Sequence, residues 1–331
     1  MPATMVETEI IKGAVRTACR APSLHNSQPW QWTLTSIGEL QLFLDSSRVL
    51  PSDRSGREAV ISCGAALGHL RVAMAATGWQ AIVERFPNPN NPYHLASVHF
   101  VPMDFVTDGH HRRAGAIGER RSDRLPFAPP ANWESFEPVL RNAIDRDDVR
   151  LDVLSDDVRS RLAQASQFTE SLRLYDSNYH SELARWTAPF EFSEGIPYSS
   201  LVSVAERDRV DVGRVFPAAH HHERRTEIPE DHATVLVLST DTDTRRDALA
   251  TGEVLSTVLL ESTMAGFATC PLTHFTELRV TREIVGRLVG DDDIVPQILV
   301  RVGLAPTVEQ APPPTPRRPL ADVFQIASDR N

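Results

Sequence analysis

Three arginines lie within five residues, Arg120 to Arg124, in the sequence Arg-Arg-Ser-Asp-Arg. A guanidinium group offers a planar fork of hydrogen-bond donors, which suits a phosphate or the carbonyl edge of a flat heterocycle. A solvated charged loop is the simpler interpretation, because exposed ion pairs are common and stabilise a fold little. The cluster therefore predicts a binding site only if other parts of the chain supply its remaining walls.

The stretch Arg20–Trp30, "RAPSLHNSQPW", combines two prolines with Ser23, Asn26 and a terminal Gln-Pro-Trp run that leads directly into a strand-like segment. Pro22 restricts the residue before it to extended backbone, so a preceding helix must end here. Trp30 is expected in the core, where it would anchor the loop. A loop constrained at both ends indicates a wall that holds a ligand in place.

Two further stretches could present donors to a ligand. In Gly266–Phe275, "GFATCPLTHF", a helix ends and a Cys-Pro turn would expose consecutive backbone N–H groups as fixed donors; a buried strand edge is the alternative. In the tail, "APPPTPRRPLADVF", a stiff polyproline arm would deliver Arg317 and Arg318 and then a short apolar strand. A loosely tethered linker is the alternative for the tail.

The composition limits the classes of function. Of the 331 residues, 41% are hydrophobic, enough for a packed core, and a net charge of −10 argues against a general nucleic-acid or anionic-membrane surface. Three widely spaced cysteines are typical of a reducing compartment, and no apolar run reaches the roughly 18 residues of a spanning helix. The first residues lack the pattern of a secretory signal. We expect a soluble cytoplasmic protein with an α/β or α+β fold.

Hydrophobic periodicity and Pro or Gly breaks predict the elements that position these motifs. In the first part of the chain we expect helices at 9–20 and 57–77 and strands at 30–35, 40–44, 80–86 and 96–101. Further along we expect helices at about 133–144, from 156 beyond 172, and at 248–265, with strands at 150–154 and 233–239. The core face of the 57–77 helix should consist of Val60, Cys63, Leu67, Leu70 and Met74.

The two long helices resemble each other. A shift of 188 residues places Cys63-Gly64 over Thr251-Gly252 and Gly78-Trp79 over Gly266-Phe267. Helices rich in Ala and Leu that end at Gly are common, so chance similarity is the alternative. If the repeat is real, each half is one subunit-like unit and the chain is a fused pseudo-dimer.

The stretch 188–232 has no clear periodicity and is rich in charge, proline and histidine, which is typical of a functional lid or a disordered insert. The run His220-His221-His222-Glu223 is unsuited to one metal ion, because adjacent side chains diverge without a special turn, and we assign no metal site. The aromatic residues that could close a lid over a flat ligand are Trp186, Phe190, Phe192, Tyr198 and Phe216.

In this order, the loop, the arginine cluster, the Gly-aromatic…Pro stretch and the Arg-Pro tail resemble the FMN-binding nitroreductase superfamily, and most closely its Acg-like branch, over essentially the whole chain. The resemblance implies an α+β nitroreductase-like fold made of two fused copies of a mixed sheet flanked by helices. It implies halves at 1–110 and 111–331, a lid-like insertion at 188–232 and a C-terminal arm at 311–326.

The resemblance also implies how an FMN would be held. Arg120 and Arg317, together with Arg318, would bind its phosphate. Ser122 and Arg124 would contact the ribityl chain and the pyrimidine edge of the ring.

The remaining contacts would come from both halves. Pro271 and Leu272 would lie against the isoalloxazine face, and a backbone N–H of Thr273 or His274 would point at flavin N5. From the other half, the loop would contribute Pro22, Ser23 and Asn26. Each motif is present in only one of the two halves, the loop in the first and the arginine motif in the second. We therefore expect one intact composite site and one that has decayed.

The family pattern has a departure at Leu24, where members often carry a small polar residue, and no catalytic acid or base can be assigned. The first functional hypothesis is an oxidoreductase that takes a hydride from NAD(P)H and reduces nitro compounds or quinones, with the cofactor supplying the redox chemistry. The second is an FMN-sequestering or storage protein whose lid closes the site. A third, an interaction scaffold that has lost its cofactor, conflicts with the intact motifs. An internal two-fold favours a monomer.

Overall fold

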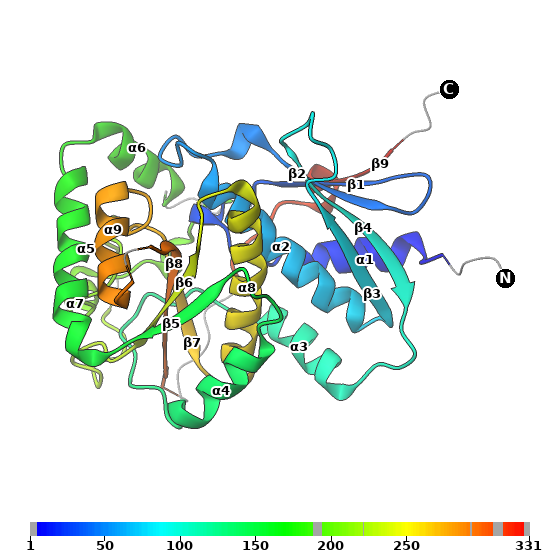
Figure 1. Cartoon of the computed structure of the whole chain (residues 1–331). Helices are drawn as coiled ribbons and strands as arrows, with labels where there is room; N and C mark the ends of the chain where they lie inside the picture. Colours follow the sequence, from blue (N-terminus) through cyan, green and yellow to red (C-terminus); the bar gives the residue numbers. More distant parts are fainter. Residues whose placement is uncertain (1–4, 188–193, 221, 292, 307–313, 328–331) are drawn as a thin grey trace.

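The computed structural model describes residues 5–187, 194–220, 222–291, 293–306 and 314–327. Two sheets form, in the orders β3-β4-β2-β1-β9 and β5-β6-β8-β7. Figure 1 shows them on either side of two long central helices, α2 (Arg57–Ala75) and α8 (Arg245–Met264). The α+β fold class is confirmed. No helix in these described ranges is both long and apolar enough to cross a membrane.

The first sheet contains β1 (Trp30–Leu34), β2 (Leu40–Leu44), β3 (Trp79–Arg85) and β4 (His94–Pro102), preceded by α1 (Thr8–Ala18) and followed by α3 (Asp108–Glu119). Its fifth strand, β9 (Phe324–Ile326), follows the short helix α10 (Leu320–Val323) near the other end of the chain and runs parallel to β1. In β1 and β2 every second residue is buried, as expected for strands with one face on the core. The C-terminal arm therefore completes the sheet of the first half.

The second sheet contains β5 (Arg150–Leu154), β6 (Thr234–Thr240), β7 (Ala268–Leu272) and β8 (Val295–Gly303). The helices of this half are α4 (Trp133–Ala143), α5 (Arg159–Arg173), α6 (Ser177–Trp186), the short α7 (Val204–Asp208) and α9 (Arg279–Val289). In Figure 1, α5 and α9 lie on the outer side of this sheet, away from α2 and α8.

The two central helices cross at two glycines. A Cβ atom on Gly64 of α2 would lie 2.2 Å from the carbonyl oxygen of Leu249, and one on Gly252 of α8 would lie 2.1 Å from that of Ile61. These two glycines are the ones that the 188-residue shift superposes. Equivalent residues meet at a crossing when a two-fold axis relates the helices, so the structure has the pseudo-dimer architecture predicted from the repeat.

The α2 prediction is confirmed, since all five residues of its expected core face are buried. The Cys-Pro turn is wrong: Cys270 and Pro271 lie inside β7, and the turn begins after Leu272. Proline is tolerated there because β7 is an edge strand, where one backbone N–H needs no ladder partner. The boundary expected at residue 110 falls inside α3, so a division between the halves would lie at one end of that helix.

Most of the stretch 188–232 lies within the described residues. Its described residues include α7, a 3-10 turn at Tyr198–Ser200 and several hydrogen bonds to the rest of the chain. Phe190, Phe192 and His221 lie outside the described residues. We refer to the described part, 194–220 and 222–232, as the cover segment.

Candidate functional site

A cavity of about 560 Å³ lies between the two halves. The first half contributes the loop residues 22–25 and one face of α2, and the second half contributes residues 122, 124 and 270–274; the cover segment forms a further wall with residues 207–216. Eight of the residues predicted from the motifs line this cavity: Pro22, Ser23, Ser122, Arg124, Pro271, Leu272, Thr273 and His274. Segments far apart in the sequence therefore meet as expected.

A smaller pocket of about 50 Å³ adjoins the cavity and shares four lining residues with it. Among the described residues five arginines line it: Arg124, which it shares with the cavity, and Arg20, Arg120, Arg121 and Arg317, which it does not share. We call it the arginine pocket. Asn26 also lines it, whereas no Asp or Glu does among the described residues. The two hollows together form one elongated site with a cationic end.

The arginine pocket concentrates positive charge without compensation. Arg120 is 5% exposed, and within the described chain its Nε and Nη1 atoms have no hydrogen-bond partner. Burial, and then Arg121 and Arg20, lower the pKa of Arg120 to about 10. Burial, and then Arg120 and Arg20, lower the pKa of Arg317 well below its usual range. Buried guanidinium groups that lie side by side and have N–H donors without partners are stabilised by a bound anion, which balances their charge.

Backbone carbonyls hold the arginines in place. Arg317 donates from Nε to the carbonyl of Cys19 at 2.9 Å and from Nη2 to that of Arg20 at 3.0 Å, and Arg120 donates from Nη2 to the same Arg20 carbonyl at 3.2 Å. These acceptors lie at the C-terminal end of α1, where helix carbonyls lack helical partners. The loop that begins at Arg20 thus orients arginines from two distant segments.

The loop itself has an unusual backbone. His25, Asn26 and Gln28 have φ of 50°, 60° and 52°, in the left-handed region that non-glycine residues seldom adopt. Ser23 Oγ accepts the N–H of Gln28 at 3.0 Å and fixes the turn. Asn26 Nδ2 donates to the carbonyls of Gly195 at 3.0 Å and Pro316 at 3.1 Å. Asn26 therefore ties the loop to the cover segment and the C-terminal arm.

Arg318 lies outside the arginine pocket, contrary to expectation. Its backbone N–H donates to Gln28 Oε1 at 2.9 Å, its Nη1 donates to the Gln28 carbonyl at 3.3 Å, and its side chain lies 3.7 Å from Asp45. These contacts turn the guanidinium toward the loop and the first sheet. Arg318 therefore anchors Gln28. The sequence analysis did not assign Arg20 and Arg121 to the site, although both lie beside Arg120 in the arginine pocket.

Thr273 is held by a buried ion pair that no sequence motif predicted. Arg214, from the cover segment, donates from Nη2 to Thr273 Oγ1 at 2.9 Å and pairs with Glu277. Thr273 Oγ1 in turn donates to Glu277 Oε1 at 2.8 Å. Burial alone would lower the pKa of Arg214, but Glu277 and then Tyr179 outweigh it, so the pKa is raised and the guanidinium stays charged.

Two buried histidines and a phenylalanine complete the cavity wall. His274 Nε2 lies 3.0 Å from Ser166 Oγ, and burial, followed by Arg214, lowers its pKa well below the usual range. His25 is likewise kept neutral by burial and by Arg214 and Arg124. The ring of Phe216 stands edge-on to His25 at 5.8 Å and lies 5.0 Å from the Arg124 guanidinium carbon. Phe216 is thus one predicted lid aromatic that lines the cavity.

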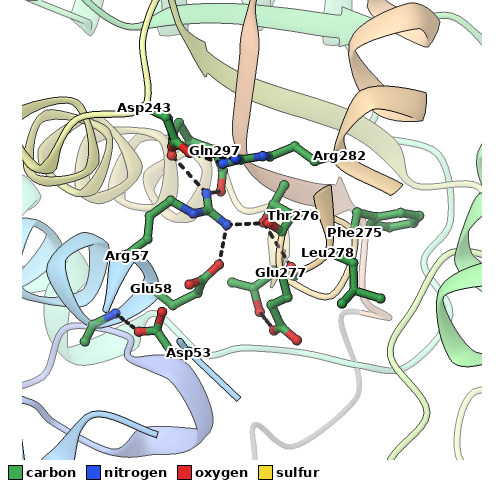
Figure 2. Close-up of polar contacts among 12 residues, drawn as sticks. Asp53, Arg57, Glu58, Asp243, Phe275, Thr276, Glu277, Leu278, Arg282 and Gln297 are labelled. Atoms are coloured by element: carbon green, nitrogen blue, oxygen red, sulfur yellow. Dashed lines mark hydrogen bonds and ion pairs between the residues drawn. The ribbon is translucent and has the colours of Figure 1, made fainter. Parts of the chain in front are cut away.

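A polar cluster beneath the cavity joins the halves (Figure 2). Arg57, at the start of α2, donates from Nη1 to the carbonyl and side-chain oxygens of Gln297, both at 2.9 Å, and from Nη2 to the carbonyl of Thr276 at 2.6 Å. It also pairs with Glu58, whose pKa burial raises despite that pairing. The turn that follows β7 is thereby fixed against the first half.

Cys270 is a buried residue of the cavity lining. Burial raises the pKa of Cys270, which keeps the thiol protonated and unreactive. Among the residues that the structure describes, no three His, Cys, Asp or Glu side chains are grouped as metal ligands.

An α+β chain whose similar halves enclose one composite cavity has the architecture of a fused nitroreductase dimer. No family model matches the chain. A protein of Mycobacterium tuberculosis H37Rv named "Putative NAD(P)H nitroreductase acg" is 59% identical over 327 residues, 98% of each chain. A second protein of that strain, Rv3131, with a name of the same form, is 36% identical over 96% of this chain and 92% of its own.

Among solved structures, that of a "putative nitroreductase" from Anabaena variabilis superposes on 89% of this chain and 73% of its own, with a TM-score of 0.51 at 8% identity, which shows a shared fold. The chain belongs to the nitroreductase superfamily, in the branch of the mycobacterial Acg protein.

Proposed function

We propose that this protein binds one FMN per chain and transfers electrons from NAD(P)H to a nitro compound or quinone. The observation that carries the proposal is the arginine pocket, whose buried and unpartnered donors open into a cavity of about 560 Å³, within the range of small-molecule sites. A phosphomonoester attached to a flat heterocycle fits a site with one cationic end and one wider chamber. The names of the relatives support NAD(P)H as the reductant.

In this arrangement Arg120 and Arg317, joined by Arg20 and Arg121, would hold the phosphate. Ser122 and Arg124 lie where the two hollows meet and would contact the ribityl chain and the pyrimidine edge. Bound FMN would supply the two-electron chemistry.

The chamber beyond this junction would hold the ring. Pro271 and Leu272 would lie against its face, and Pro22 and Ser23 would approach it from the other half. A backbone N–H of Thr273 or His274 would stabilise negative charge at N5. The Arg214–Glu277 pair and Arg57 hold this turn in place, so the donor would need no rearrangement as the charge develops.

The alternative is an FMN-sequestering protein with little turnover. The cover segment is fastened to the site by Asn26 to Gly195, by Arg124 to the carbonyl of Ser200 at 3.5 Å and by the Arg48–Glu194 ion pair. If these contacts keep the cavity closed, neither NAD(P)H nor an acceptor reaches the flavin. Lid closure is a matter of free energy, so kinetics must decide between the two.

One experiment separates the candidates. The purified protein, loaded with FMN and monitored by its visible spectrum, is mixed anaerobically with excess NADPH. Rapid bleaching and reoxidation by a quinone support the oxidoreductase. Bleaching by dithionite but not by NADPH or NADH supports sequestration, and a protein that cannot retain FMN contradicts both. Measuring the mass in solution tests the expected monomer with one flavin.

A further inference from the structure

Four carboxyl groups line the cavity, and they differ in their partners. Three of them belong to ion pairs, at 3.2 Å or less, with an arginine. Within the described residues the fourth, Glu170, has no such pair. The three ion pairs are Glu58–Arg57, Asp208–Arg207 and Asp211–Arg159.

Glu170 lies near the C-terminal end of α5 and is partly buried. Its Oε1 accepts the backbone N–H of Val215, in the cover segment, at 3.2 Å. Burial raises the pKa of Glu170 and Glu277 adds to this, while the Val215 N–H, Arg214 and Arg173 act in the opposite direction; the net pKa is raised. Glu170 is therefore better able than an ordinary glutamate to carry a proton at neutral pH.

The position of Glu170 places it on the side of the cavity that holds the turn after β7. Ser166, one helical turn earlier on α5, contacts His274 at 3.0 Å. Arg214, which acts electrostatically on Glu170, donates to Thr273 Oγ1. Glu170 thus lines the same cavity as Thr273 and His274, the two residues whose backbone is expected at flavin N5.

The proposed reaction needs one proton from outside the electron donor. A quinone that becomes a hydroquinone takes up two electrons and two protons. One proton and both electrons arrive together as a hydride equivalent from the reduced cofactor. The second proton must bond to the other quinone oxygen, and a positioned acid speeds such a transfer.

We propose that Glu170 is the acid that supplies this second proton to the acceptor; the proposal rests on the proposed function. The carboxyl O–H bond of Glu170 breaks as the hydroquinone O–H bond forms, and water from the cavity reprotonates the carboxylate. Reduction of the bound cofactor by NAD(P)H consumes no such proton. Glu170 therefore acts on the oxidative half of the cycle.

The test compares Glu170→Gln with the wild type in two anaerobic stopped-flow experiments on FMN-loaded protein, namely reduction by NADPH and reoxidation of the reduced protein by a benzoquinone. Gln keeps an oxygen that accepts the Val215 N–H. We expect reoxidation at pH 7 to slow about 100-fold or more relative to reduction, within the usual contribution of a general acid. Glu170→Asp, which retains a carboxyl group, should recover part of the rate. Glu283→Gln, an exposed carboxyl on α9, is the matched control.

A second measurement does not depend on turnover. In apoprotein labelled with ¹³C at the glutamate carboxyls, the signals of Glu58 and Glu170 should both titrate above the usual 4.5, and Glu170→Gln should remove only the second of them. An unchanged ratio of the two half-reaction rates in Glu170→Gln, or an ordinary titration of its signal, would overturn the proposal. If NADPH fails to reduce the wild type, the proposed function fails, while reoxidation after dithionite still tests Glu170.

Discussion

The two faces of the pseudo-dimer differ at equivalent positions. A shift of 188 residues places 271–273 of the cavity, Pro-Leu-Thr, over 83–85, Val-Glu-Arg. Both triplets lie at the end of an edge strand, β7 in one half and β3 in the other. One edge carries short and apolar side chains beside a cavity, and the other ends in a long cation.

That cation is satisfied within the protein. Arg85 donates from Nε and Nη2 to the two carboxylate oxygens of Glu253, each at 2.7 Å, and Arg146 and Arg71 lie 3.4 and 3.6 Å from the same carboxylate. Glu253 occupies the α8 position equivalent to Ala65 of α2. On this face the charges neutralise one another, whereas the arginine pocket on the other face lacks any acid in its described lining. The same fold thus accommodates both arrangements, and the face with uncompensated charge is the one proposed above to bind a ligand, the ligand-binding face.

The scaffold common to both faces should be the most sensitive part. Gly252→Ala and Gly64→Ala each place a Cβ within about 2.2 Å of a backbone oxygen on the facing helix. Because the helices must separate, we expect each to cost about 3 kcal/mol or more in the free energy of unfolding. The measurement is urea denaturation. Gly115→Ala in α3, where a Cβ meets nothing within 4 Å, should instead stabilise by about 0.5–1 kcal/mol. Unequal costs at the two glycines would argue against the pseudo-symmetry.

Removing a cation from the ligand-binding face comes next. Arg120→Met should weaken FMN binding by about 100-fold, since charge-assisted hydrogen bonds contribute about 1.5–3 kcal/mol each. In the apoprotein the same change should raise the melting temperature, because it removes a buried charge whose pKa is lowered. Calorimetry with and without FMN measures both, and Arg287→Ala, on an exposed part of α9, is the control. FMN retention equal to that of the wild type after dialysis would refute the phosphate assignment.

Removing the acid from the other face should leave the ligand-binding face intact. Glu253→Gln uncouples Arg85 and should lower the free energy of unfolding by about 2 kcal/mol, below the usual cost of breaking a buried pair because Arg85 is partly exposed. The FMN content should stay at one per chain. A double-mutant cycle with Arg85→Met measures the coupling. Loss of FMN in a stable Glu253→Gln protein would show that the faces are not independent.

The sequence was most informative where local chemistry decides the structure. Gly78 and Gly266 end their helices with φ of 85° and 81°, as a residue without a side chain allows, and the strands at 40–44 and 150–154 have the expected bounds. Helices α3, α6 and α9 and strand β8 were missed, as were the short helices α7 and α10. Pro271 indicated a turn because a proline breaks most strands, and only its place on a sheet edge permits β7.

The same distinction applies to the site. The motifs predicted eight of the residues that line the cavity, because the family resemblance assigns those positions to one site. Arg214, Glu277 and Glu170 were missed because nothing local sets them apart from other charged residues. Their roles follow from tertiary contacts between α5, the cover segment and the turn after β7. Arg20 could have been found, since it directly precedes the Ala-Pro-Ser loop and shares its chemistry.

The smallest expected effect is a difference in pH dependence between the faces. His274 of the cavity has Phe86 as its equivalent on the other face, so only one face carries a histidine here. The folded-state pKa of His274 lies well below 6.5, mainly through burial. Above pH 6.5 the imidazole is neutral in both the folded and unfolded states, and its contribution to stability is fully present. Below pH 6.5 the unfolded chain binds a proton that the folded chain does not bind, so the free energy of unfolding decreases as the pH is lowered.

Each such histidine contributes a slope of up to about 1.4 kcal/mol per pH unit. In the apoprotein, His274→Gln should therefore make the fall in the free energy of unfolding between pH 6.5 and pH 5 less steep, by the slope that one bound proton contributes. Urea denaturation at each pH measures this slope. Gln retains a donor for Ser166, and His99→Gln, at a largely exposed histidine on β4, serves as the control. An unchanged slope in His274→Gln would mean that the folded protein accepts a proton at this position. The turn after β7 would then carry a positive charge at acid pH, and FMN affinity would have to rise as the pH falls.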